Sequence, residues 1–274
     1  MNDNIARRIV ISGASNGIGR AIAQRLSHID SVIINLDICD GDETASRCQG
    51  RFHTVNVDVG ARGAVTDAFD LVDQLLEGHA PDLLVCCAAL SRAAPLLEVQ
   101  PDDLDRMMDI NVKGTFSCCQ EAARRMIDAN RGHIVIITSI CAVQGWAGES
   151  VYCVTKGAQQ SLVQALSVEL APFNILVNAV APGIIEQTGE SMAKTWFDPE
   201  VERHDLERTA LQRFGTPAEV ADAVYYLSTV TWMTGQTIFL DGGFMASGLS
   251  YFGNAKARLR RSMPGEKENQ ERQQ

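Results

Sequence analysis

Short runs of apolar, often β-branched residues alternate with longer helical patterns along almost the whole chain. Seven runs are predicted to be strands: Arg8–Ser12, Ser31–Leu36, Phe52–Val57, Leu83–Cys87, His133–Thr138, Leu176–Val180 and Thr237–Leu240. They are apolar on both faces, which is typical of a parallel sheet that helices cover on both sides. The clearest helical patterns are Gly17–Leu26, Asp102–Ile127, Val151–Leu170 and Pro217–Leu227. The alternation predicts an α/β fold, a Rossmann-type doubly wound parallel sheet of about seven strands in a single domain.

The chain of 274 residues contains no repeat and no interdomain linker, so we expect one domain over residues 1–249. Residues 186–209 are polar and have no strand pattern. Loops of this length are usually functional, so we expect a substrate loop there. Residues 250–274 are predicted to form a C-terminal tail, which we expect to be disordered from about Pro264 onward.

Charge and hydropathy argue against two classes of partner. The net charge is −10, whereas a nucleic-acid binder needs a concentrated basic face. No apolar run approaches the roughly 20 residues that cross a bilayer, so we expect no membrane partner. The first strand pattern begins too early to leave room for a signal peptide, which predicts a cytoplasmic protein.

The eight cysteines include no Cys-x-x-Cys pair and no histidine at zinc spacing. We therefore expect no metal site. So many thiols without a secretory signal indicate a reducing compartment, in which they remain free.

A glycine-rich turn joins the first strand to the first helix, with the sequence Gly13-Ala14-Ser15-Asn16-Gly17-Ile18-Gly19. Glycines let the backbone approach a pyrophosphate, which binds at the N-terminus of a helix. Such turns also arise for packing reasons, but the position after the first strand is the one that a dinucleotide site requires. We predict that the cofactor contacts Gly13, Ser15, Asn16, Gly17, Ile18 and Gly19.

Asp37 closes the second strand, 18 residues beyond Gly19. A carboxylate there accepts hydrogen bonds from both hydroxyls of an adenosine ribose and repels a 2′-phosphate. The chain has no lysine or arginine between Val32 and Arg47. The pattern favours NAD over NADP, with the alternative that Asp37 is only a turn former at a strand end. Asp58, after the third strand, is expected beside the adenine.

Tyr152 and Lys156 are four residues apart at the start of a helical pattern, so both project from one face. An ammonium beneath a phenol lowers the tyrosine pKa, which suits Tyr152 to exchange a proton with an alcohol or carbonyl. Ser139 ends the fifth strand, at the carboxyl edge where ligands bind in such sheets. The spacing predicts a catalytic site at this edge.

With these motifs the chain resembles the classical short-chain dehydrogenase/reductase family over roughly Arg8 to Gly243. The matching pieces are the glycine turn, Asp37, Asn56-Val57-Asp58-Val59, Asn111-Val112-Lys113-Gly114, Ser139, Tyr152 with Lys156, Asn178 through Gly183, and Asp241-Gly242-Gly243. The resemblance implies that Tyr152 is the general acid/base, Ser139 steadies the substrate oxygen and Lys156 also binds the nicotinamide ribose. It implies that Asn111 bends its helix and holds a water that relays protons to Lys156. It adds cofactor contacts at Asp58, Val59, Ala88, Pro182, Gly183 and Ile185.

The chain departs from this family at two places. The family usually has Asn-Asn-Ala-Gly after the fourth strand, whereas this chain has Cys86-Cys87-Ala88-Ala89. We therefore expect the amide hydrogen bonds that steady the central strands to be lost. Gln187 stands where the family often has a threonine that bonds the nicotinamide carboxamide, and Thr188 follows one residue late.

Three functions remain open. The leading one is an NAD(H)-dependent oxidoreductase that interconverts a secondary alcohol and a ketone. The second is a reductase of 3-oxoacyl chains on a carrier protein, which Asp37 and the Phe173-Asn174 pair oppose, because such family members usually prefer NADPH and have Arg-Gly there. The third is a non-catalytic dinucleotide-binding or scaffold protein, which the intact Asn111, Ser139, Tyr152 and Lys156 oppose.

Four large side chains are expected to line or cover the pocket, which suggests an apolar or cyclic substrate: Trp146, Met192, Trp196 and Phe197. The alternative is that they only pack the segment in which they lie.

We also expect a homo-oligomer, a tetramer. The helix Asp102–Ile127 has more apolar side chains than one sheet face needs, and surplus apolar area usually marks an interface. These side chains are Met107, Met108, Phe116, Cys118 and Cys119. Phe244, Met245, Tyr251 and Phe252 are expected to dock on a neighbouring subunit.

Overall fold

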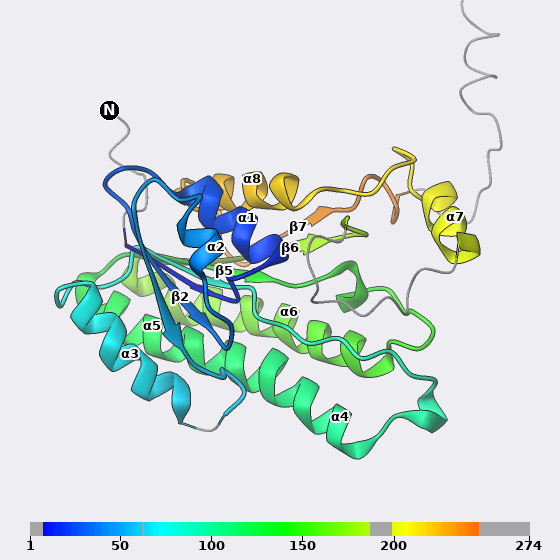
Figure 1. Ribbon diagram of the computed structural model, residues 1–274, viewed down its shortest axis with the longest axis horizontal. Helices are drawn as coiled ribbons and strands as arrows, with labels where there is room; N and C mark the ends of the chain where they lie inside the picture. Colours follow the sequence, from blue (N-terminus) through cyan, green and yellow to red (C-terminus); the bar gives the residue numbers. More distant parts are fainter. Residues whose placement is uncertain (1–7, 62, 187–198, 247–274) are drawn as a thin grey trace, which may run out of the picture.

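A single sheet of seven parallel strands organises the described part of the chain, in the order β3-β2-β1-β4-β5-β6-β7 (Figure 1). The computed structural model describes residues 8–61, 63–186 and 199–246. The strands are β1 (Arg8–Ser12), β2 (Val32–Asp37), β3 (Arg51–Asn56), β4 (Leu83–Cys86), β5 (Gly132–Ile137), β6 (Ile175–Pro182) and β7 (Thr237–Leu240). The order reverses between β1 and β4, where such sheets bind ligands beyond the carboxyl ends of the strands. The predicted fold class is confirmed.

Helices cover both faces of the sheet (Figure 1). On one face lie α1 (Gly17–Leu26), the short α2 (Asp42–Ala45) and α8 (Pro217–Leu227). On the other lie α3 (Ala64–Leu75), α5 (Thr115–Ala129) and α6 (Ser150–Leu170). Strand side chains therefore point alternately into two separate cores: Val10 packs in one, and Ile9 and Ile11 pack in the other. This is why the strands are apolar on both faces.

The segment predicted as one helix over Asp102–Ile127 is three elements, so that prediction is wrong. They are α4 (Pro101–Met107), a π-helical turn η2 (Met108–Gly114) and α5. A π-turn keeps the chain helical and usually occupies a single turn inside an α-helix, so the apolar pattern did not separate it from its neighbours. Asn111 lies within η2, where the family resemblance places a bend.

Residues 186–209 are not loop throughout, because α7 (Pro199–Arg208) lies within them. The 3₁₀ turns η1 (Leu96–Glu98), η3 (Ile140–Ala142) and η4 (Ala171–Phe173) complete the described elements. None of the helices in the described ranges is long and apolar enough to cross a membrane.

Most of the apolar side chains that were expected to form a subunit interface are instead buried within the chain itself. Met107, Cys118 and Cys119 are buried within the chain, at 1% exposure or less, and the two cysteines pack in the core on this face of the sheet. Phe244 is likewise 1% exposed and stacks on Trp146, so its predicted docking on a neighbour is wrong. Phe116 is 49% exposed and remains available. Tyr251, Phe252 and Pro264 lie outside the described residues.

Candidate active site

The glycine turn between β1 and α1 lies at the carboxyl edge of the sheet, next to the end of β4. Gly13 has φ +82°, and a Cβ there would lie 2.8 Å from the backbone Cα and N of Ala88. A Cβ on Gly19 would collide with the Gly13 carbonyl oxygen. These two glycines are thus required by the packing of the turn itself. The Asn16 side chain caps α1 by accepting from the Gly17 N–H at 2.9 Å.

Asp37 lies beside this turn, at the end of β2. Its Oδ2 accepts from the Ser15 N–H at 3.0 Å, and its Oδ1 accepts from the Cys39 N–H at 3.1 Å. Two backbone donors therefore fix the carboxylate at the edge of the turn. Asn35 supports the same corner, because its Oδ1 accepts from the Ala14 N–H at 2.8 Å and its Nδ2 donates to Ser15 Oγ at 2.9 Å.

Arg20, which directly follows the turn in sequence, is tied to neighbouring groups. Its guanidinium donates to the Ser15 carbonyl at 2.7 Å and pairs with Glu43 at 2.8 Å. Glu43 also pairs with Arg47 at 2.6 Å. The two arginines near the segment after β2, Arg20 and Arg47, are thus both paired with Glu43.

The other predicted cofactor residues on the first half of the sheet are placed as follows. Asp58 lies beyond the end of β3 and forms an ion pair with Arg106 of α4 at 2.6 Å. Val59 is buried against η2, where a Cβ on Gly114 would lie 2.8 Å from the Val59 carbonyl oxygen. The close contact between the β3 end and η2 explains why a glycine stands at position 114.

The end of β4 carries thiols at the positions where the family pattern has amides. The Ser12 hydroxyl accepts from the N–H groups of Cys87 and Ala88 at 3.2 and 3.3 Å. Cys86 points into the core, with its Sγ 3.9 Å from that of Cys119. This end of β4 is thus held by main-chain bonds to Ser12 and by thiol packing, without a side-chain amide at position 86 or 87.

Ser139, Tyr152 and Lys156 come together next to the carboxyl end of β5. Ser139 starts η3, and its Oγ accepts from the Cys141 N–H at 3.1 Å. Tyr152 and Lys156 project from the first turns of α6, with Lys156 Nζ 5.4 Å from the centre of the Tyr152 ring. The structure therefore brings together the three residues that the sequence predicts to be catalytic.

Burial determines the protonation of this group. It raises the pKa of Tyr152, with further increases from Cys141 and Glu149, while a hydrogen bond with Ser139 opposes the shift. Burial also lowers the pKa of Lys156 to about 8. The expected depression of the Tyr152 pKa is thus not found, because burial is the largest effect on the phenol and Cys141 and Glu149 add to it. The phenol is neutral at neutral pH, the form that can donate a proton.

Asn111 supports the site from η2 and is fully buried. Its Oδ1 accepts from the Leu90 N–H at 2.8 Å, and its Nδ2 donates to the Leu90 carbonyl at 2.8 Å and to Thr155 Oγ1 at 3.0 Å. Its main-chain carbonyl accepts from Gln159 Nε2 at 2.7 Å. Gln159 is not among the residues predicted from the sequence, although its spacing of three residues from Lys156 places both on one face of α6.

Pro182, Gly183 and Ile185 follow the end of β6. The Gly183 N–H donates to the Leu240 carbonyl at 2.9 Å, and Ile185 pairs with Gly215 in an isolated bridge. The backbone that is predicted to border the nicotinamide is therefore anchored to β7 and to the segment before α8. Gln187, Thr188, Met192, Trp196 and Phe197 lie outside the described residues.

Two further contacts lie near Tyr152 in sequence. Trp146 stacks on Phe244 with ring centres 5.4 Å apart and planes at 14°, and the Arg208 guanidinium lies 4.4 Å from the Phe244 ring centre.

Glu149 is 6% exposed and accepts from the Ser91 hydroxyl at 3.1 Å, and burial raises the pKa of its carboxyl. Glu149 is not among the residues predicted from the sequence, because an acid just before a helix looks like an ordinary first-turn residue.

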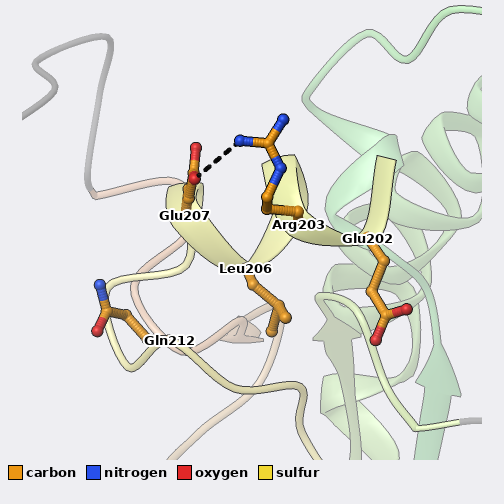
Figure 2. A pocket seen from close by; sticks show the side chains of 5 residues that line it. All are labelled: Glu202, Arg203, Leu206, Glu207 and Gln212. Atoms are coloured by element: carbon orange, nitrogen blue, oxygen red, sulfur yellow. Dashed lines mark hydrogen bonds and ion pairs between the residues drawn. The ribbon is translucent and has the colours of Figure 1, made fainter. Parts of the chain in front are cut away.

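The side of α7 forms a hollow of about 310 Å³. Figure 2 shows the five residues that line it, with an ion pair of 3.4 Å between Arg203 and Glu207: Glu202, Arg203, Leu206, Glu207 and Gln212. None of the predicted site residues is among them, so this hollow is not the catalytic site.

Comparison with known proteins gives consistent similarities. A family model described as enoyl-(acyl carrier protein) reductase matches residues 13–245. The chain is 32% identical to a 3-oxoacyl-(acyl-carrier-protein) reductase of Aquifex aeolicus, covering 85% of this chain and 95% of that protein. It is 34% identical to the L-xylulose reductase of Bos taurus, covering 88% and 97%.

The solved structures agree with these similarities. A gluconate 5-dehydrogenase from Burkholderia cenocepacia, in complex with NADP and tartrate, superposes with a TM-score of 0.79 at 28% identity, covering 88% of this chain and 95% of that one. A 3-oxoacyl-(acyl-carrier protein) reductase from Brucella melitensis superposes with a TM-score of 0.78 at 31% identity, covering 86% and 90%.

Proposed function

The chain belongs to the short-chain dehydrogenase/reductase family, and from this premise we propose that it is an NAD(H)-dependent oxidoreductase that interconverts a secondary alcohol and a ketone. The observation that supports the chemistry is the group formed by Ser139, Tyr152 and Lys156 at the carboxyl edge of the sheet. A nicotinamide cofactor, when bound, supplies or accepts the hydride.

The residues at the glycine turn fit a dinucleotide. Gly13 has φ +82° and packs against the backbone of Ala88, so the turn is tight and leads directly into the N-terminus of α1, the kind of place where a pyrophosphate binds. Ser15, Asn16, Gly17, Ile18 and Gly19 are the proposed phosphate-side contacts, and Asp37 is the proposed partner of the adenosine ribose. On the nicotinamide side we propose Pro182, Gly183 and Ile185.

In the direction of ketone reduction, the neutral phenol of Tyr152 donates a proton to the carbonyl oxygen as hydride reaches the carbonyl carbon. The Ser139 hydroxyl donates a hydrogen bond to the same oxygen and steadies its developing charge. The Lys156 ammonium lies below the Tyr152 ring and also holds the nicotinamide ribose. In alcohol oxidation the same residues act in reverse, with Tyr152 as the base.

The charge around Asp37 supports NAD over NADP. Asp37, Asp40, Asp42 and Glu43 lie within seven residues, and Arg20 is already paired with Glu43. A 2′-phosphate would therefore meet carboxylates without an available arginine from the turn. The gluconate 5-dehydrogenase of similar structure is described in complex with NADP, the cofactor that this proposal disfavours for the present chain.

The proposal is tested by assaying the purified protein with NAD and NADP. The alcohol panel includes cyclic alcohols, because of the Trp146–Phe244 stack, and polyols, because of the buried Glu149 carboxyl beside Ser91. We expect turnover with NAD to exceed turnover with NADP. NADH binding without turnover of any alcohol or ketone would instead support a scaffold protein, and a preference for NADP would contradict the cofactor assignment.

A second candidate is the reduction of 3-oxoacyl groups on a carrier protein, which the similarity to the Aquifex aeolicus enzyme favours. The two candidate functions are distinguished by assaying the purified protein with an acetoacetyl thioester and NADH or NADPH. Efficient reduction of the thioester, with no activity on the alcohol panel, would replace the first proposal by the second.

A further inference from the structure

The Lys156 ammonium is buried, with 2% of the residue exposed. Its Nζ donates to the Ile137 carbonyl at 2.9 Å and to Gln159 Oε1 at 3.0 Å. A charge in the interior requires such acceptors, because it has lost its hydration. Gln159 therefore supplies one of the groups that keep Lys156 charged and in place.

The orientation of the Gln159 amide follows from its neighbours. Its Nε2 donates to the Asn111 carbonyl at 2.7 Å and to Thr115 Oγ1 at 2.8 Å, while its Oε1 faces Lys156. An ammonium has no acceptor and a carbonyl has no donor, so the reversed amide would break the contacts with both Lys156 and Asn111. Gln159 itself is 2% exposed. One side chain thus connects Lys156 to the Asn111 carbonyl without an intervening molecule.

The groups that hold Gln159 are themselves fixed. Asn111 is bonded through its side chain to both main-chain groups of Leu90 and to Thr155 Oγ1. Thr115 starts α5, directly after η2. The amide therefore joins α6 to the π-turn, and its position is set by two elements.

We propose that Gln159 is the positioning residue of Lys156, and that its amide fills the path to Asn111 which the family resemblance assigns to a relay water. The inference rests on the proposed function. An amide holds its two protons on nitrogen and does not pass one on near neutral pH, whereas a water can. Lys156 then acts as a fixed charge, and the partly exposed Tyr152 regains its proton from solvent on the substrate side.

The protonation of Lys156 can be followed separately from that of its neighbours. The titratable side chains that face it are Tyr152 on α6, Cys86 and Cys87 at the end of β4, and Cys141 in η3. Hydrogen bonds with Cys118 and Cys119 together with burial raise the pKa of Cys86, and burial raises the pKa of Cys87 to about 12 and that of Cys141 to about 11. The pKa of Tyr152 is also raised. The thiols and the phenol of this cluster are thus shifted upward, whereas burial lowers the pKa of Lys156 to about 8.

The test compares Gln159→Met, which removes both hydrogen-bonding ends, with Gln159→Glu, which keeps an acceptor for Lys156. Gln164→Met makes the same change at an exposed position of the same helix. Circular dichroism checks that each variant is folded. NADH affinity, from fluorescence, and turnover are then measured from pH 6 to 10.

We expect both quantities in the native protein to decline as pH rises through the Lys156 pKa, because the charged lysine is lost. In Gln159→Met the ammonium loses an acceptor, so the decline should move to lower pH by about one unit. In Gln159→Glu the acceptor is retained and negative charge is added, so the decline should stay in place or move to higher pH. Gln164→Met should match the native protein.

An unchanged pH profile in Gln159→Met, or the same downward shift in Gln159→Glu, would overturn the proposal. The proposed function is judged separately. If the native protein binds NADH but turns over no substrate, the shifts in NADH binding still establish the role of Gln159 while the oxidoreductase proposal fails.

Discussion

At the scale of single residues, the proposed chemistry depends on the Tyr152 hydroxyl. Tyr152→Phe removes that oxygen and keeps the ring above Lys156. We expect turnover to fall by a factor of about 10² to 10⁴, the usual contribution of a positioned acid or base, with NADH affinity close to native. Steady-state kinetics and NADH fluorescence measure the two effects. Tyr226→Phe, at an exposed site on α8, is the matched control. Near-normal turnover of Tyr152→Phe would refute the assignment.

The proposed cofactor choice depends mainly on Asp37. We expect Asp37→Ala combined with Ile38→Arg to move the ratio of kcat/KM for NAD and NADP toward NADP, because repulsion of a 2′-phosphate is relieved and a cation is added. Ile38 is 63% exposed, so the arginine has room. Asp30→Ala makes the same charge change as Asp37→Ala at the opposite end of β2 and should leave the ratio unchanged. An unaltered ratio in the double variant would contradict the role of Asp37.

The residues whose place the sequence predicts most directly are those tied to the end of a strand. Gly13, Asp37 and Ser139 each lie at or just after the end of a strand, so the sheet brings them to one edge whatever the helices do. Gln159 and Glu149 could not be found in this way. An amide or an acid on a helix is usually a surface residue, and only the packing of α6 against η2 and the β4 loop places these two inside.

At the scale of elements, contacts with distant residues also explain why the helix predicted over Asp102–Ile127 is interrupted. The stretch from α4 to α5 keeps helical spacing of its apolar residues, so periodicity predicts one helix. The π-turn η2 forms because Asn111 is held by Leu90 and Gly114 lies against Val59. Those contacts come from residues more than twenty positions away, which no local pattern encodes.

The start of α8 offers a test of local stability. Thr216 Oγ1 accepts from the Glu219 N–H at 3.3 Å and the Glu219 carboxylate accepts from the Thr216 N–H at 2.8 Å, which forms a capping box. We expect Thr216→Ala to lower the free energy of unfolding by about 1 kcal/mol, because the cap is lost. Urea denaturation at pH 7 measures it. Thr216→Ser keeps the hydroxyl and should remain near native, and equal losses in both variants would argue against the cap.

At the scale of the whole molecule, we propose a homo-tetramer. A hollow of about 280 Å³ lies between η2, α5 and α6 and is lined mostly by apolar side chains that include Val112, Phe116 and Leu162. Such an open apolar surface is typical of an interface. Light scattering of the native protein should give the mass of four chains.

We expect Phe116→Glu to reduce the mass to that of a smaller assembly, because a charge would be buried at the interface. Leu97→Glu, at a residue that is 96% exposed on η1, is the control and should leave the mass unchanged. A native mass of one chain would refute the oligomer, and a mass of two chains would refute the tetramer.

The sheet divides the interior into two cores that share no side chain, and this division determines how substitutions combine. Ile22 of α1 packs in one core and Ile134 of β5 in the other. Replacing either by valine should lower the free energy of unfolding by about 0.5–1.5 kcal/mol. Because a side chain that relaxes on one side of the sheet cannot fill a gap on the other, the double variant should equal the sum within about 0.5 kcal/mol. Ile22 and Ile9 share a core. The loss of unfolding free energy in their double variant can therefore differ from the sum of the two single losses. The tolerance of this fold to accumulated sequence change is thus set separately on each side of its sheet.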